Sequence, residues 1–211
     1  MSEAALKPRQ AERPAKDRRR QEILDAAFRE FSENGYGGTS MEAIARRAKA
    51  SKETLYSWFK NKETLFNTLY VSRLEGLNSR VADTIAKDPS PANLLPVIAE
   101  DVLRLMLNIL PLTSGIPSGS KASRILGKTI SEERKDFTNY LIWCRSAGYI
   151  DFEDDPYEVA SLFIAMTQGE WGLRLSAGLV KHVTDEMIRK HAQMVTRMFL
   201  KALAPAKKKQ G

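Results

Sequence analysis

The sequence predicts an all-α protein of about nine helices, with a small N-terminal three-helix domain followed by a larger C-terminal helical domain. Helix-forming residues dominate the 211-residue chain, and runs of β-branched residues are scarce. Apolar residues recur at helical spacing in segments separated by Gly- and Pro-containing breaks. Because 43% of the residues are apolar, the chain can bury a core and is not a disordered protein.

The first predicted helix runs from about residue 18 to 33. Its apolar residues Ile23, Ala27 and Phe31 recur every four positions and therefore share one face. Asn34-Gly35 follows, and this pair is typical of a helix that ends in a left-handed residue.

Two short helices and the start of a long one are predicted next. Thr39 opens the capping box TSME, Ser51 is the predicted cap of a helix over 52–58, and Asn61 opens a long helix that reaches about residue 86. A helix, a tight turn and a second helix form a helix-turn-helix unit. We expect this N-terminal domain to span residues 18–66, with its second short helix placed to enter a DNA groove.

The remainder, residues 67–204, is predicted to be a helical body. Asp155 followed by Pro156 is a typical helix start, and Gly148 a typical helix end. The helices expected in this body cover 93–110, 121–129, 131–147, 155–178 and 184–203, with a loop at 111–120.

Positive charge is concentrated at both ends of the chain and in one internal block. Residues 1–20 contain seven basic and three acidic residues, and residues 39–62 contain six basic and two acidic ones. Residues 1–17 are predicted to form a flexible basic arm, and residues 205–211 a basic tail. This placement indicates a polyanionic partner.

Several features favour a soluble cytoplasmic protein, associated with the nucleoid and without membrane contact. The N-terminal residues include no apolar stretch of the kind found in signal peptides. The most apolar run, 102–112, is interrupted by Arg104 and Asn108 and is too short to span a bilayer. The single cysteine, Cys144, suits a reducing compartment.

The stretch SKETLYSWFK, residues 51–60, combines inward apolar residues with outward polar and aromatic ones. Leu55 and Phe59 are four apart and are expected to pack inward, which directs Lys52, Tyr56 and their neighbours outward. Hydroxyl and ammonium groups beside helix N-termini are suited to phosphate contacts. A solvated basic face is the alternative, and we favour a DNA-binding surface.

The runs T-S-M-E-A-I-A, S-K-E-T-L-Y and F-K-N-K-E-T-L-F carry a specific resemblance. The block from Arg18 to Leu69 resembles the DNA-binding domain of TetR-family transcriptional regulators. The resemblance implies that Thr39 holds a phosphate and that Lys62 contacts a flanking phosphate. It also implies that Lys52, Thr54, Tyr56 and Trp58 face the major groove. The residues expected to contact DNA are Thr39, Ser40, Ser51, Lys52, Thr54, Tyr56, Ser57, Trp58, Lys60 and Lys62.

Two positions depart from the family pattern. Lys49 occupies the turn where the family commonly has Gly, and a left-handed turn there would be strained by about 1 kcal/mol. Trp58 stands where His or Tyr is frequent, which puts an inherited base preference in doubt.

Catalysis and metal binding find little support in the sequence. His182 and His191 are nine residues apart and lack a Cys or acidic partner at ligand spacing, and Cys144 is expected to be a packed thiol. No phosphate loop or catalytic triad pattern is recognisable. We therefore expect no enzyme activity, no cofactor and no metal, although a helical enzyme without a motif is a third class to consider.

The resemblance further implies a repressor that binds a palindromic operator as a homodimer and is released by a small molecule. The alternative is a ligand-independent DNA-binding protein whose body only dimerises or recruits a protein partner. An apolar or aromatic effector would suit the large side chains of the body, most of which will be core; the candidates are Met106, Phe137, Tyr140, Trp143, Phe163, Met166, Glu170 and Trp171. The residues expected at the dimer interface are Leu173, Ile188, Val195, Met198 and Phe199.

Overall fold

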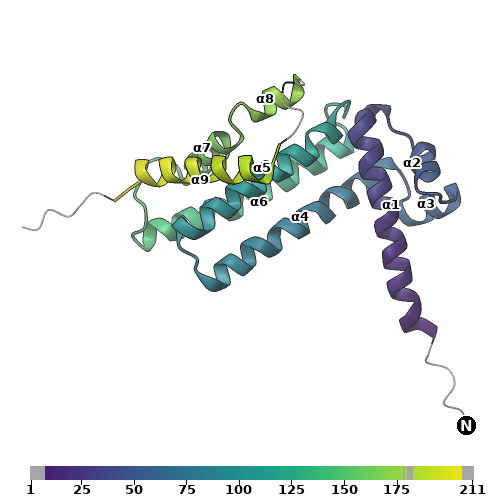
Figure 1. The fold of residues 1–211 in the computed structure, drawn as a ribbon, viewed down its shortest axis with the longest axis horizontal. Coiled ribbons are helices and arrows are strands. Elements are labelled where there is room, and N and C mark those ends of the chain that lie inside the picture. Colours follow the sequence, from purple (N-terminus) through teal and green to yellow (C-terminus); the bar gives the residue numbers. More distant parts are fainter. Residues whose placement is uncertain (1–7, 178, 180–182, 206–211) are drawn as a thin grey trace, which may run out of the picture. The chain divides into compact units, whose positions relative to one another are not determined.

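The computed structural model describes residues 8–177, 179 and 183–205, and these residues form nine α-helices and one 3₁₀-helix without a β-strand (Figure 1). The all-α prediction is therefore confirmed. The elements are α1 (Pro8–Gly38), α2 (Met41–Arg47), α3 (Lys52–Phe59), α4 (Lys62–Lys87), α5 (Pro91–Ile109), η1 (Pro111–Thr113), α6 (Lys121–Ser146), α7 (Pro156–Gln168), α8 (Trp171–Ser176) and α9 (Asp185–Ala202). Within the described residues, every helix is too short or too polar to cross a bilayer.

The helices group into two compact units. The N-terminal unit contains Met1–Val71 together with Pro111–Ser123, and the C-terminal unit contains Ser72–Leu110 and Arg124–Gly211. The sequence predicts an N-terminal domain that ends at residue 66, which would assign the segment Pro111–Ser123 to the body. In the structure, this segment packs with the N-terminal helices instead. The N-terminal unit is thus built from two separate stretches of the chain.

Helix α1 is longer than the sequence predicts. It begins at Pro8 rather than near residue 18, because Pro suits the first helical position and the Ala, Gln, Glu, Arg and Lys residues that follow it favour helix. Part of the expected flexible arm is therefore helical, and residues 1–7 and 206–211 lie outside the described residues. The helix is kinked at Gly35, whose φ of 67° confirms the left-handed residue predicted there.

Three glycines allow the segment after α5 to lie directly on the end of α1. The Gly37 N–H donates to the Ser114 carbonyl at 3.1 Å. A Cβ atom on Gly35 would lie 2.7 Å from the same carbonyl oxygen, and one on Gly115 would lie 3.0 Å from the Gly37 backbone. A side chain at position 35 or 115 would therefore clash with the facing segment. We call this meeting of Gly35, Gly37, Ser114 and Gly115 the glycine contact.

The C-terminal unit has its core where α5, α6, α7 and α9 meet. Phe163 is fully buried, and its ring centroid lies 5.2 Å from that of Phe137 and 4.8 Å from that of Phe199. Leu95, Leu141 and Val195 belong to the same cluster of buried side chains. Three helices separated in sequence are therefore joined by one set of aromatic contacts.

Two predicted helix boundaries in this unit are wrong. The helices expected at 121–129 and 131–147 form one continuous helix, because Ser131 does not cap a new one and instead donates its hydroxyl to the Gly127 carbonyl at 2.9 Å. The helix expected over 155–178 ends at Gln168, since Gly169 has a φ of 48° and breaks it before α8.

Substitution of Gly35 by alanine should destabilise the protein. The positive φ disfavours alanine by about 1–3 kcal/mol, and the added methyl group would overlap the Ser114 carbonyl. Gly127→Ala is the matched control, because no atom lies within 4 Å of its added methyl group and helix propensity predicts about 0.5–1 kcal/mol of stabilisation. Denaturant unfolding of the two variants should give opposite shifts, and equal shifts would contradict the glycine contact.

Candidate nucleic-acid interface

The N-cap of helix α2 lies one residue later than the sequence predicts. Ser40 is the N-cap, and its hydroxyl accepts a hydrogen bond from the Ala43 N–H at 3.1 Å. Thr39, which the sequence predicts as the cap of α2 and as a phosphate contact, is instead buried, with its hydroxyl 2.8 Å from the Gly35 carbonyl and 3.1 Å from the Glu30 carbonyl. Its side chain thus joins α1 to the start of α2 and is not available to DNA.

Helix α3 presents the inward and outward faces that its sequence predicts. Ser51 caps it by accepting from the Thr54 N–H at 3.1 Å, and Leu55 and Phe59 are fully buried. Lys52, Ser57 and Lys60 are exposed, as is Tyr56 with 43% of its surface accessible; Thr54 and Trp58 are half-buried. The apolar face holds the helix in the unit, and the other face carries a lysine, a tyrosine and hydroxyl groups to the surface.

The turn between α2 and α3 contains a left-handed residue that is not glycine. Lys49 has a φ of 49°, so the turn is left-handed at a residue for which such a conformation is disfavoured. One guanidinium nitrogen of Arg19, on α1, donates to the carbonyls of Ala48 at 3.0 Å and Lys49 at 2.8 Å. No local pattern indicates this contact, because it joins residues about thirty positions apart.

Lys62 is held by the protein rather than directed at solvent. Its ammonium donates to the carbonyls of Tyr36 at 2.8 Å and Thr39 at 2.9 Å, and lies 4.4 Å from the centroid of the Tyr36 ring. Partial burial lowers the pKa of Lys62 below its ordinary value. Its expected phosphate contact is therefore replaced by a structural role, in which it joins α4 to the connection between α1 and α2.

Arg47 forms a second link between the short helices and α1. Its guanidinium donates to Glu30 at 2.7 Å and also pairs with Glu33. The hydrogen bonds to Glu33 and Glu30 raise the pKa of Arg47 above its usual range. Lys52 and Glu42, with an N–O separation of 3.5 Å, add an exposed ion pair between α3 and α2. The positive charge of Arg47 is thus neutralised by the two acidic residues of α1. The other exposed basic residues of α2, α3 and their connections are Arg46, Lys49, Lys52 and Lys60.

The residues expected to bind an effector fall into different environments. Phe137 and Phe163 are core residues, and Tyr140 donates its hydroxyl to the Pro89 carbonyl at 2.8 Å. Trp143 is 42% exposed and stacks on Tyr140. Met106, Met166 and Trp171 are half-buried, and Met166 packs against the core of the C-terminal unit. Glu170 is exposed and paired with Arg174 at 2.9 Å.

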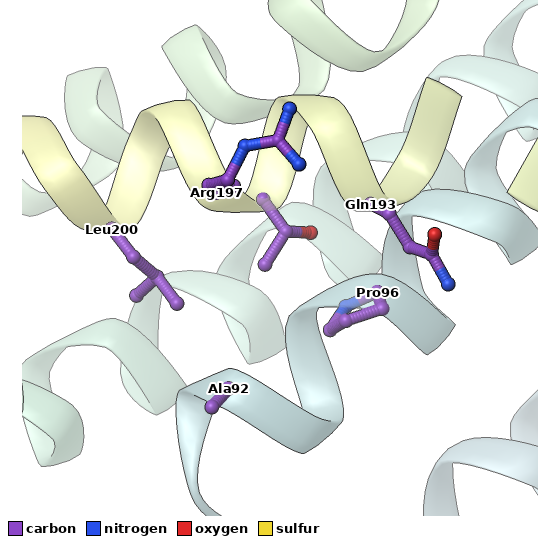
Figure 2. Close-up of a pocket in the computed structure, with 6 residues that line it drawn as sticks. Ala92, Pro96, Gln193, Arg197 and Leu200 are labelled. Carbon is purple, nitrogen blue, oxygen red and sulfur yellow. The ribbon is translucent and has the colours of Figure 1, made fainter. Parts of the chain in front are cut away.

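A shallow hollow of about 340 Å³ lies between α5 and α9 (Figure 2). Figure 2 shows Ala92 and Pro96 on one helix and Gln193, Arg197 and Leu200 on the neighbouring helix, and Thr196 completes the lining. The eight residues that the sequence suggests as effector contacts are all absent from this lining.

A charged cluster that the sequence does not indicate joins three helices of the C-terminal unit. Arg80 on α4 donates to Asp101 at 2.5 Å and to Glu100 at 3.0 Å, and Arg104 pairs with Asp185 of α9 at 2.6 Å. Asp101 is buried, and the loss of water around it raises its pKa to about 6 despite the neighbouring Arg80.

The predicted dimer residues divide into two groups. Ile188, Val195 and Phe199 are buried within the C-terminal unit, so their assignment to an interface is wrong. Helical spacing alone does not distinguish a face buried in the chain's own core from one that meets a partner. Met198 and Leu173, in contrast, are 54% and 74% exposed.

Two of the remaining titratable candidates, His191 and Cys144, have packing roles. A ring nitrogen of His191 lies 2.8 Å from the Thr167 carbonyl, and His182 lies outside the described residues. Cys144 is fully buried, as its packing prediction requires, and burial raises the pKa of its thiol. No group of three His, Cys, Asp or Glu side chains suited to a metal occurs in the described part of the chain.

Comparison with known proteins identifies relatives for the N-terminal unit and for the whole fold. Residues 23–69 match the family described as bacterial regulatory proteins, tetR family. Over 72 residues the chain is 36% identical to the uncharacterised transcriptional regulator YhgD of Bacillus subtilis (34% of this chain, 37% of the relative). Over 75 residues it is 33% identical to the transcriptional repressor KstR of Rhodococcus jostii (36% and 35%). These matches span little more than a third of each relative's length.

A solved structure extends the similarity to most of the chain. The flavonoid-responsive regulator FrrA superposes with a TM-score of 0.61 at 27% sequence identity, and the superposition covers 90% of this chain and 98% of that protein. The similarity in fold to a known regulator therefore includes the helical body as well as the N-terminal helices.

Replacement of Lys62 by methionine should lower the free energy of unfolding by about 1–3 kcal/mol, because two part-buried carbonyls lose their common donor. Lys52→Met removes the same charge from an exposed side chain and should leave the unfolding midpoint unchanged. Thermal and denaturant unfolding measure both effects. A Lys62→Met variant as stable as the wild type would show that the ammonium is not a structural bridge.

Proposed function

We propose that the chain, whose residues 23–69 match the tetR family of bacterial regulatory proteins, is a repressor that binds a palindromic operator as a homodimer and is released by a small molecule. The observation that carries this proposal is the division of α3 into a buried face, Leu55 and Phe59, and an exposed face with Lys52 and Tyr56. A short helix held in this way by its apolar side can place its polar side in a major groove.

The DNA-contacting set that we propose differs from the one suggested by sequence. Ser51, Lys52, Thr54, Tyr56, Ser57, Trp58 and Lys60 keep their assignment, Ser40 is an exposed cap beside them, and Arg46 is added. Thr39 and Lys62 support the surface from within and are left out. Lysine and arginine would contribute phosphate contacts, whereas Tyr56 and Thr54 are suited to base edges and thymine methyl groups.

Two copies of α3 are needed because one eight-residue helix reads few base pairs. A two-fold symmetric dimer that holds two such helices about 34 Å apart would read a palindrome. Exposed apolar side chains on the C-terminal helices support a partner contact there: Leu162 on α7, and Met187, Met194 and Met198 on one face of α9. We propose that α7 and α9 of two chains pack as a four-helix interface.

The effector that we propose is a flat aromatic molecule. FrrA, which is similar over most of the chain, is named for its response to flavonoids. The C-terminal unit also contains several aromatic side chains that are not fully buried, among them Tyr140, Trp143 and Trp171.

A thermal-shift screen should give a higher melting temperature with flavonoids than with acyl-CoA esters. The same flavonoids should release bound DNA, and the absence of any flavonoid effect on melting or on DNA binding would contradict this assignment.

Replacement of Lys52 by glutamine should weaken operator binding and lower the salt slope of log K by about one unit, since one phosphate contact is lost. The operator can be selected from a random duplex library, and affinities measured by fluorescence anisotropy over about a fourfold range of salt concentration. Lys128→Gln on α6 is the control, because it removes the same charge from an exposed side chain of a helix outside the proposed DNA and dimer contacts. Equal slopes for both variants would mean that α3 carries only a solvated basic face.

A Leu162→Glu, Met198→Glu double variant should sediment as a monomer at micromolar concentration and lose most of its operator affinity. Both side chains are more than half exposed in the single chain, so charge there should leave folding intact while opposing burial at an interface. Ile85→Glu, at an exposed apolar position of α4, should remain dimeric. A double variant that is still a dimer would place the interface elsewhere.

A further inference from the structure

The short turn that leads into α3 lacks the conformational freedom of glycine. Lys49 is left-handed, and its N–H donates to the Arg46 carbonyl at 3.2 Å, while the Ala50 N–H donates to the Ala45 carbonyl at 2.9 Å. These bonds use carbonyls near the end of α2. The carbonyls of Ala48 and Lys49 come after the helix and sit at its negative end, where a cation is favoured.

Arg19 provides that cation from a fixed position on α1. Its second guanidinium nitrogen donates to Glu22 at 2.6 Å, about one turn further along the same helix. This bond orients the planar guanidinium so that the other nitrogen reaches both turn carbonyls, at 3.0 and 2.8 Å. A lysine has a single nitrogen and could not reproduce this forked arrangement.

The neighbouring arginines are engaged differently. Arg18 is exposed, and the guanidinium of Arg20 lies 5.6 Å from the ring centroid of Phe59, at the other end of α3. Of these three consecutive residues, Arg19 therefore contacts the turn before α3 and Arg20 contacts the last residue of α3. Helix α1 constrains α3 at both of its ends.

We infer that Arg19 is a positioning residue for DNA recognition, which holds the left-handed turn at Lys49 and so fixes the direction in which α3 leaves it. This inference rests on the proposed DNA binding. Helix α3 begins at Lys52, three residues after the left-handed one, so a change in the turn would redirect every side chain that α3 presents. Because its guanidinium is occupied by carbonyls, Arg19 acts through the turn and not through a phosphate.

The test is a double-mutant cycle between positions 19 and 49, with Arg18→Ala as the matched control. Arg19→Ala should weaken operator binding about tenfold at every salt concentration, with an unchanged salt slope, because no phosphate contact is lost. Arg19→Lys keeps the charge and should also weaken binding. Lys49→Gly should recover most of the affinity lost in Arg19→Ala, since glycine adopts the turn without strain. Arg18→Ala should not be rescued by Lys49→Gly.

Melting temperatures of the four proteins in the cycle make the test independent of DNA. Arg19→Ala should lower the melting temperature more in the wild-type chain than in the Lys49→Gly variant, while circular dichroism at about room temperature shows that each variant is folded. Additive melting temperatures, or an Arg19→Ala salt slope reduced by about one unit without rescue by Lys49→Gly, would overturn the inference. A wild-type chain that selects no operator would contradict the proposed function, and the melting cycle would still decide whether Arg19 holds the turn.

Discussion

The shortness of α2 and α3 is the constraint on which the N-terminal unit depends. Helices of seven and eight residues are not stable alone in water, because the cost of starting a helix is recovered over too few hydrogen bonds. Contacts with the longer helices must therefore supply the stabilisation that these short helices lack on their own. Arg47 binds the acids of α1, Lys62 joins α4 to the connection before α2, and Leu55 and Phe59 bury the inner face of α3. The exposed face is therefore only as well ordered as these inner contacts.

Local signals in the sequence predict most helix starts correctly. Ser51, Asp155 and Thr184 each accept a backbone N–H as N-caps, and the Asn61 side chain does the same for α4. The predicted cap of α2 is wrong by one residue because Thr39 and Ser40 both carry hydroxyls. Burial decides between them, and burial depends on α1, which no local pattern describes. The break at Gly169 escapes prediction for a related reason, since apolar spacing continues on both sides of it.

The candidate site can be predicted where a residue's role follows from its own helix. The inward Leu55 and Phe59 and the exposed Lys52 and Tyr56 follow from spacing alone. Lys62 cannot be assigned in this way, because its partners Tyr36 and Thr39 lie more than twenty residues earlier. Val195 and Phe199 show the same limit in the body: an apolar stripe predicts burial but does not say whether the covering surface belongs to the same chain.

The glycine contact has a consequence for the order in which the chain can fold during its synthesis. Gly35 and Gly37 meet Ser114 and Gly115, so the N-terminal unit includes residues that the ribosome adds only after the whole of α5. Contacts between distant parts of a sequence form late, because the intervening chain must first be ordered. A nascent chain that stops at Val71 contains all three N-terminal helices and still lacks the segment that covers the end of α1. The N-terminal unit is therefore completed by residues made after α5, and a truncated translation product would carry an unfinished one.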